Sequence, residues 1–255
     1  MSSATTMISL CVAVYRDHGE PNLASLQRDL PAALAGQAGE LVAALNGIDA
    51  ELAGVSAGAI TVDLGINRGV APAWNAAARA ARGEILVFCN DDVKLGSGAL
   101  ARLAGALDEN PRAGVVGPLG SRWDLAGAKH LSWVKPASAD ELASCDVVSG
   151  FLFACHRETW VEVAGFDERY APASWEEVDF CTAVRASGRE CYAVGGVACA
   201  HEWGVSRRQP PWARAHWCGR SETWRSIHRR NRRRFLQKWS EHPLARAQTS
   251  AGGGA

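Results

Sequence analysis

The sequence lacks several features that would each define a class of protein. Its eight cysteines form no CxxC pair, so the simplest account of them is small buried core residues in a reducing cytosol. No GxGxxG follows a predicted strand and no P-loop is present, which disfavours dinucleotide-binding and P-loop enzymes. No apolar run approaches the roughly 18 residues of a membrane span, and residues 1–6 are too polar for a signal peptide. We therefore expect a cytoplasmic protein.

The chain also lacks an excess of charge of either sign. Lys and Arg number 27, as do Asp and Glu, so the formal net charge is zero and the whole molecule has no electrostatic bias toward nucleic acid or membrane. This neutrality hides an arginine-rich segment at 225–238.

That segment lies in a predicted amphipathic helix over 221–239. Apolar spacing puts one face together, with arginines opposite; the face comprises Trp224, Ile227, Asn231, Phe235 and Trp239. The arginines fit a solvated face, or a contact with anionic lipid head groups or a polyprenyl-diphosphate acceptor at the inner membrane face. Nucleic acid is disfavoured, because the aromatic residues form a packing stripe and do not interleave with the basic ones.

Hydrophobic periodicity predicts an α/β fold with a mostly parallel sheet flanked by helices. The expected strands are 7–14, 40–45, 60–64, 85–89, 114–116, 151–155 and 191–197, the last extending toward residue 200; the expected helices are 23–34, 70–81, 99–107, 157–163 and 175–186. We expect one domain over 7–240, with a nucleotide-binding half at about 7–120 and an acceptor half at about 121–240. The tail, 241–255, is expected to be disordered.

The most informative segment is the apolar run 85–89, which ends in Asn90-Asp91-Asp92. A strand that delivers adjacent carboxylates to its C-terminal edge creates a hard-metal site where α/β folds bind ligands. The other interpretation is ordinary turn chemistry, which also favours Asn and Asp.

Two further polar groups lie at predicted helix N-termini. Asn67, Gly69 and Asn75 flank the start of the helix at 70–81, where free N–H groups attract anions and glycine permits a close backbone approach. Glu176 and Glu177 begin another helix; they either stabilise its positive end or provide a general base.

The order of these groups resembles the family 2 glycosyltransferases with a GT-A fold, especially the rhamnosyltransferase-like members, over roughly 7–240. The motifs are NRGVAPAWN at 67–75, NDD at 90–92, VSGF at 148–151, GFDE at 165–168, WEEVDFC at 175–181, AH at 200–201 and FLQKW at 235–239. The resemblance implies a metal-dependent, inverting transfer of a sugar from a nucleotide-sugar donor to an acceptor hydroxyl. The acceptor would be a glycan, lipid-linked or small molecule, in polysaccharide, glycolipid or glycoconjugate synthesis, including the cell envelope.

The resemblance also implies roles for individual residues. The Asp-x-Asp-type motif stands as Asn90-Asp91-Asp92, with Asp92 as direct metal ligand and Asp91 on the ribose or the loop. His201 completes the shell of a Mn²⁺ or Mg²⁺ ion, and its imidazole favours Mn²⁺. Glu177 matches the position of the family's aspartate base, and Glu176 remains a candidate because the Glu side chain is longer.

The resemblance further implies that one set of residues lines the nucleotide-sugar pocket: Ala13, Tyr15, Asn46, Asn67, Arg68, Gly69, Asn75, Asn90 and Asp91. Leu45-Asn46 stands where the family has Asp-Asn, so the usual carboxylate for the nucleobase is absent and Asn46 is its substitute. Gly150 and Trp175 would form an acceptor and sugar wall, with core packing as the other interpretation of Trp175. Asp179 is expected to fix its helix or an arginine such as Arg185.

Two other functions stay open. A nucleotidyltransferase also uses strand-end carboxylates, but it needs a Gly-rich basic loop after the first strand, which 15–21 does not provide. A catalytically silent sugar-nucleotide or glycan-binding module is compatible with the altered residues Leu45, Asn90 and Glu177.

Overall fold

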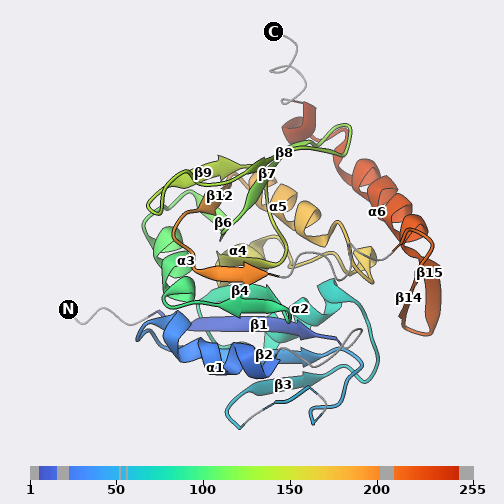
Figure 1. Ribbon diagram of the computed structural model, residues 1–255. Helices are drawn as coiled ribbons and strands as arrows, with labels where there is room; N and C mark the ends of the chain where they lie inside the picture. Colours follow the sequence, from blue (N-terminus) through green and yellow to red (C-terminus); the bar gives the residue numbers. More distant parts are fainter. Residues whose placement is uncertain (1–5, 16–22, 52, 56, 202–209, 247–255) are drawn as a thin grey trace.

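The computed structural model describes residues 6–15, 23–51, 53–55, 57–201 and 210–246. Its centre is an eight-stranded sheet of order β3-β2-β1-β4-β11-β6-β12-β9, in which β11 and β9 run antiparallel to their neighbours (Figure 1). The predicted mostly parallel sheet is thereby confirmed. The strands are β1 (Ile8–Val14), β2 (Gly39–Leu45), β3 (Ile60–Asp63), β4 (Ile85–Asn90), β6 (Ala113–Gly117), β9 (Leu142–Cys145), β11 (Leu152–His156) and β12 (Glu190–Val194).

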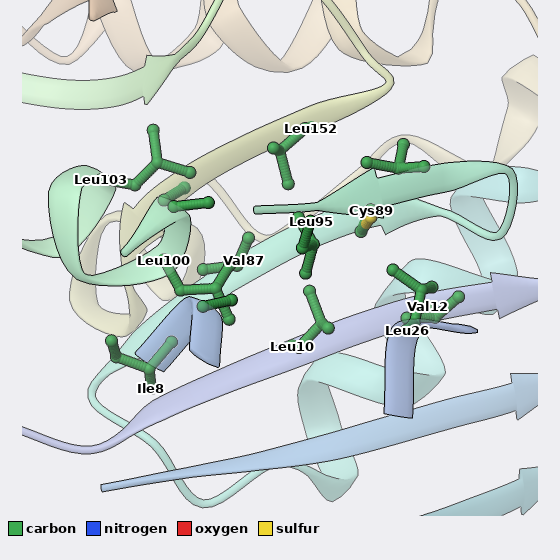
Figure 2. Close-up of a cluster of buried hydrophobic side chains, with 14 of the residues drawn as sticks. Ile8, Leu10, Val12, Leu26, Val87, Cys89, Leu95, Leu100, Leu103 and Leu152 are labelled. Carbon is green, nitrogen blue, oxygen red and sulfur yellow. The ribbon is translucent and has the colours of Figure 1, made fainter. Parts of the chain in front are cut away.

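Helices cover both faces of this sheet, as the continuous apolar strands require. They are α1 (Leu23–Leu34), α2 (Val70–Ala80), α3 (Ala99–Asp108), α4 (Arg157–Glu162), α5 (Glu176–Ala186) and α6 (Trp224–Trp239), with a short 3₁₀ helix η1 (Glu168–Tyr170). Side chains of β1 alternate between two cores. Leu10 and Val12 join α1 and α3 in one core (Figure 2). Cys11 and Ala13 join α2 and α5 in the other.

Three small sheets, which the sequence did not predict, surround the central one. One has the order β10-β7-β8, from β10 (Val147–Val148), β7 (Gly120–Asp124) and β8 (Lys129–Val134). A second pairs β5 (Val93–Leu95) with β13 (Cys199–His201), and a third is the hairpin of β14 (Arg214–Trp217) and β15 (Arg220–Thr223).

Two predicted elements are therefore wrong in their bounds. The single strand expected over 191–200 is two strands, β12 and β13, in separate sheets. The helix expected from 221 begins at Trp224, because 220–223 pairs with β14 and the Thr223 side chain accepts the Ser226 N–H as an N-cap.

Helix α6 lies at the side of the molecule, next to the β14–β15 hairpin (Figure 1). Its buried residues are Ile227, Asn231, Phe235 and Trp239, as the predicted stripe requires, whereas Trp224 is only half-buried. The predicted Asp179–Arg185 contact is wrong, because Arg185 pairs with Asp146 at 2.9 Å.

Buried Asp179 instead joins α5 to α6. Its carboxylate accepts from Lys238 Nζ at 2.7 Å, Trp239 Nε1 at 2.7 Å and the Tyr170 hydroxyl at 3.1 Å. Three donors from two other segments therefore converge on one side chain.

The cysteines follow the prediction with two exceptions. All eight are free, and six are buried, whereas Cys199 is half-buried and Cys218 is exposed. Burial raises the pKa of the Cys145 thiol to about 12, so it stays a neutral thiol near pH 7. Within the described residues, no helix combines the length and the hydrophobicity that a membrane span requires.

Candidate active site

The Asn90-Asp91-Asp92 segment lies at the C-terminal edge of the parallel strands, as predicted. Asn90 ends β4 beside Ala13 of β1. The Tyr15 backbone N–H donates to Asp91 Oδ2 at 3.1 Å and so ties the segment after β1 to this edge. Burial, reinforced by the nearby Asp92 carboxylate, raises the pKa of Asp91 to about 6 against the opposing effect of the Tyr15 N–H.

Asp92 and His201 come together through the second small sheet. Antiparallel pairing aligns His201 with Val93, directly after Asp92. His201 Nε2 then lies 3.1 Å from Asp92 Oδ1, and the His201 side chain is only 9% exposed. The imidazole stacks on the Phe151 ring, with centroids 4.7 Å apart and planes 6° apart. Packing therefore fixes the orientation of the imidazole.

This pair fits a divalent metal ion in its chemistry. Asp92 Oδ1 is buried and accepts no hydrogen bond within the described residues, although His201 Nε2 is near it. A carboxylate oxygen and an imidazole nitrogen are both ligands that Mn²⁺ accepts. In the described part of the chain, no three His, Cys, Asp or Glu gather as a metal site, so the pair provides two candidate protein ligands.

Glu176 and Glu177 begin α5 after a strained connection. Ser174 and Trp175 both have left-handed backbone conformations, with φ of 82° and 80°, which side chains rarely adopt without support from their surroundings. Burial raises the pKa of both glutamates, and the Glu177 charge raises that of Glu176 further. Glu176 is 7% exposed, and its Oε2 has no hydrogen-bond partner in the described structure.

Gly150 packs directly against Glu177. A Cβ at Gly150 would lie 3.3 Å from Glu177 Cβ and Cγ and 3.4 Å from Cδ, closer than most side-chain contacts allow. The next residue, Phe151, stacks on His201, and its carbonyl accepts the Asn90 N–H at 2.9 Å. Two consecutive residues therefore connect the Glu177 carboxylate to the Asp92–His201 pair.

Helix α6 supports the connection that leads to the glutamates. Buried Asn231 donates from Nδ2 to the carbonyls of Tyr170, Ala173 and Ser174, at 2.7, 3.2 and 2.9 Å. Arg230 donates to the Ala171 carbonyl and pairs with Glu222. Our sequence reasoning assigned Asn231 no role, although an amide within an apolar stripe is a signal of such a buried contact.

The residues predicted to line the nucleotide pocket mostly bond to one another and to nearby loops. Asn46 donates to Asn67 Oδ1 at 3.0 Å and to the Gly69 carbonyl at 3.3 Å, and accepts the Arg68 N–H at 2.7 Å. The Asn67 amide donates to the His216 carbonyl at 2.7 Å. The two asparagines therefore hold the loop before α2 against β14.

Gly69 and Asn75 connect α2 to the second half of the chain. A Cβ at Gly69, whose φ is +102°, would lie 2.8 Å from the Pro172 backbone, and Val70 N–H donates to the Pro172 carbonyl. We expected the Gly69 backbone to approach a ligand closely; in the structure it closely approaches the Pro172 backbone of the protein itself. The Asn75 amide both donates to and accepts from the Phe166 backbone and donates to Glu168.

Trp175 is buried and packs between Trp123 and Phe235, at 5.4 and 5.2 Å. Trp175 therefore makes the core-packing contacts that were expected as the alternative to a role in the sugar wall. A shallow pocket of about 310 Å³ lies elsewhere, between Ile66, Asn67 and the turn of the β14–β15 hairpin. Its lining includes neither the Asp92–His201 pair nor the glutamates.

Comparison with known proteins agrees with this architecture. Residues 50–138 match the family model described as glycosyl transferase family 2. A structure of GalNAc-T7 with UDP, GalNAc and Mn²⁺ superposes with a TM-score of 0.68 at 14% identity over 94% of this chain and 49% of that one. The mannosyltransferase PcManGT from Pyrobaculum calidifontis, in complex with GDP-Man and Mn²⁺, gives 0.56 at 18% identity over 81% and 59%. No curated protein sequence matches.

The chain thus spans about half the length of the solved structures that it resembles. At these identities the superpositions show the fold, which is that of the GT-A glycosyltransferases. Together with the family match, they support the family 2 glycosyltransferase that the sequence motifs predicted. The rhamnosyltransferase-like part of that prediction is not shown.

Proposed function

We propose that this protein is a metal-dependent, inverting glycosyltransferase that moves a sugar from a nucleotide-sugar to an acceptor hydroxyl. The observation that carries the proposal is the connection through Gly150 and Phe151, which links a carboxylate of raised pKa to the Asp92–His201 pair. Transfer of a sugar needs both parts, a base for the acceptor and a cation site for the diphosphate leaving group.

In this proposal, Asp92 and His201 would hold a Mn²⁺ or Mg²⁺ ion, which neutralises charge on the departing diphosphate when bound. The nucleotides in the two similar structures, UDP in one and GDP-Man in the other, motivate a diphosphate nucleotide here. Ala13, Tyr15, Asn90 and Asp91 would lie along the donor at the strand ends. The loop held by Asn46 and Asn67, with Arg68, Gly69 and Asn75, would set the shape of the donor site around the nucleobase.

Glu177 would take the proton from the acceptor hydroxyl as its oxygen attacks the anomeric carbon. Attack on the face opposite the diphosphate inverts the anomeric configuration. A raised pKa makes a carboxylate a better match to a proton acceptor at neutral pH. The Gly150 contact favours Glu177 over the buried Glu176 as the base, since the three atoms nearest to a Cβ at residue 150 all belong to the Glu177 side chain. Gly150 and Trp175 would border the acceptor.

The test uses single-turnover transfer and hydrolysis with UDP-, dTDP- and GDP-sugars in the presence of Mn²⁺. Glu177→Gln should lower the chemical step by roughly 10² or more while the donor affinity is kept. If Glu176→Gln has this effect instead, the base is Glu176. If a donor binds and none is turned over, the protein is a silent sugar-nucleotide-binding module. If no donor binds, it is a glycan-binding module or another enzyme.

We also propose a peripheral contact between α6 and anionic membrane. Arg225, Arg229 and Arg233 recur every four residues and are exposed, which aligns them on one side of the helix. Each Arg or Lys near an anionic membrane surface contributes about 1 kcal/mol to the free energy of membrane binding. Co-sedimentation with phosphatidylcholine vesicles containing phosphatidylglycerol, and not with phosphatidylcholine alone, should be lost when all three become Gln. Equal sedimentation of this variant and the parent would contradict the contact.

Such a contact would locate the enzyme at the cytoplasmic face of the inner membrane, where lipid-linked acceptors of cell-envelope polysaccharides are available. The domain would comprise residues 7–240, with donor functions in the first half and acceptor functions in the second. The expected disorder of 241–255 is wrong for 241–246, because residues 243–246 are helical and Ala245 is buried. Residues 247–255 lie outside the described part of the chain.

A further inference from the structure

The helix that carries the candidate base begins in an unusual way. Its N-cap residue is Trp175, whose side chain makes no capping hydrogen bond, whereas Ser, Thr, Asp or Asn usually occupies this place. Ser174 and Trp175 both have left-handed backbones, with φ of 82° and 80°. Such a conformation costs free energy and persists only where the surroundings support it. The position of Glu177, two residues further on, therefore depends on what holds this connection.

The main support is one buried amide on α6. Asn231 is fully buried, and its Nδ2 donates to the carbonyls of Tyr170, Ala173 and Ser174 at 2.7, 3.2 and 2.9 Å. Arg230 Nε donates to Asn231 Oδ1 at 3.2 Å, so the nitrogen end of the amide faces the carbonyls. The other buried positions of α6 carry apolar or aromatic side chains. The amide at this place is therefore explained by its bonds to the connection, because a buried amide without bonds would be costly.

A second contact comes from His228, which precedes Asn231 by three residues and so lies on the same side of the helix. Its Nδ1 accepts from Trp175 Nε1 at 3.4 Å and lies 3.3 Å from the Ser174 hydroxyl oxygen. Partial burial lowers the pKa of His228, so the imidazole is neutral near pH 7 and its Nδ1 can accept a hydrogen bond. We name His228 and Asn231 the α6 clamp, because together they contact both left-handed residues.

Helix α6 also holds α5 on the other side of the candidate base. Asp179, two residues after Glu177, accepts from Lys238 Nζ and from Trp239 Nε1, both at 2.7 Å. Glu177 therefore lies between two attachments to the same helix, the α6 clamp before it and Asp179 after it. A change in how α6 holds the connection would displace the first turn of α5 and the Glu177 carboxylate with it.

We propose that Asn231 and His228 are positioning residues, which hold the connection 170–175 so that the Glu177 carboxylate meets the acceptor hydroxyl. This inference rests on the proposed function and assigns it two residues of α6. Both act through the connection and not on the reacting atoms. A reacting group displaced by about 1 Å can lose about 10²-fold in rate, so the hydrogen bonds of the α6 clamp contribute to turnover as well as to stability.

The experiment measures single-turnover consumption of the UDP-, dTDP- or GDP-sugar that the wild type uses, with Mn²⁺. Asn231→Leu keeps a branched side chain and loses the amide donors; it should lower the rate by about tenfold or more. His228→Ala should lower the rate by about threefold or more. Gln237→Ala is the matched control, because Gln237 is exposed on the same helix; it should match the wild type. The rise in melting temperature with nucleotide and Mn²⁺ should be equal in all four proteins.

A double-mutant cycle with Glu177→Gln separates positioning from stability. If Asn231 acts through the base, Asn231→Leu should change the rate of the Glu177→Gln enzyme by less than about twofold, because the group that it positions is already absent. A loss of stability alone would lower the rate by the same factor in both backgrounds, and that result would overturn the inference. If Asn231→Leu does not fold, the same cycle with His228→Ala decides, since His228 is exposed.

The failure of this inference can be told apart from the failure of the proposed function. If the wild type consumes a donor and both Asn231→Leu and His228→Ala keep its rate, the α6 clamp alone is wrong. If the wild type consumes no donor, the inference fails together with the proposed function.

Discussion

Gly150 and Glu177 lie so close together that the methyl group of an alanine at residue 150 would crowd the Glu177 side chain. A Cβ at residue 150 would lie 3.3 Å from Glu177 Cβ and Cγ, inside ordinary van der Waals contact. Gly150 does not have a left-handed backbone conformation, so its backbone does not require glycine. The reason for glycine at this position is the space taken by the side chain of the candidate base. The position of the Glu177 carboxylate therefore depends on a residue outside its own helix.

The first prediction follows from this contact. Gly150→Ala should displace the Glu177 side chain by a few tenths of an ångström and lower turnover by about tenfold or more, since small misplacements of reacting groups are costly. Nucleotide affinity should be unchanged. Gly105→Ala is the control, because a Cβ there has no neighbour nearer than 3.9 Å; it should keep turnover and leave stability equal or slightly higher. Full turnover in Gly150→Ala would separate this contact from catalysis.

The second prediction concerns the pH dependence of stability. The folded-state pKa of Glu176 is raised above its unfolded value, so its contribution is complete below the unfolded pKa and is lost as the pH rises through the folded pKa. The wild-type free energy of unfolding should therefore fall from pH 5 toward pH 8, by up to about 1.4 kcal/mol per pH unit for each such group. The free energy of unfolding of Glu176→Gln should fall less steeply over the same pH range.

Urea denaturation at each pH measures this slope. Glu51→Gln is the control, because Glu51 is exposed, and it should reproduce the wild-type slope. Parallel curves for the wild type and Glu176→Gln would show that Glu176 is ionised in the folded protein at pH 5.

The third prediction concerns the junction of α5 and α6. Asp179→Ala removes the acceptor for Lys238, Trp239 and the Tyr170 hydroxyl, which leaves the buried Trp239 and Tyr170 donors without this acceptor. Unfolding free energy should fall by about 3 kcal/mol or more. Asp140→Ala, an exposed aspartate, should change it by less than about 0.5 kcal/mol. Equal stability of the two variants in urea would contradict the role of Asp179.

Seven of the eight strands of the central sheet were predictable from their apolar residues, whereas β9 was missed, because three of its four residues are at least partly exposed. The run at 85–89 is buried on both faces, and its side chains divide between two cores, so its composition alone indicated a central strand. The small sheets were not predictable. Most residues of β8 are exposed, and β5 and β13 have three residues each, so neither shows a periodic pattern.

The sequence motifs named the members of the candidate site but not the contacts among them. The motif order indicated Asp92, His201 and Glu177, but the Asp92–His201 contact depends on pairing between β5 and β13, which are distant in sequence. The same holds for Asn46 and Asn67, whose amides bond to each other. A side chain that folds onto a distant loop looks, in the sequence alone, the same as one that faces a ligand.

The most direct test of the account is the melting temperature of the wild type and Asp92→Ala with UDP, dTDP, GDP, CDP or ADP, each with and without Mn²⁺. A ligand at a hundredfold excess over its Kd stabilises the folded state by about 2.7 kcal/mol. The account predicts that at least one nucleotide raises the wild-type melting temperature only with Mn²⁺, and that Asp92→Ala, folded without ligand, loses this rise. An equal rise in Asp92→Ala, or none in the wild type, would contradict it.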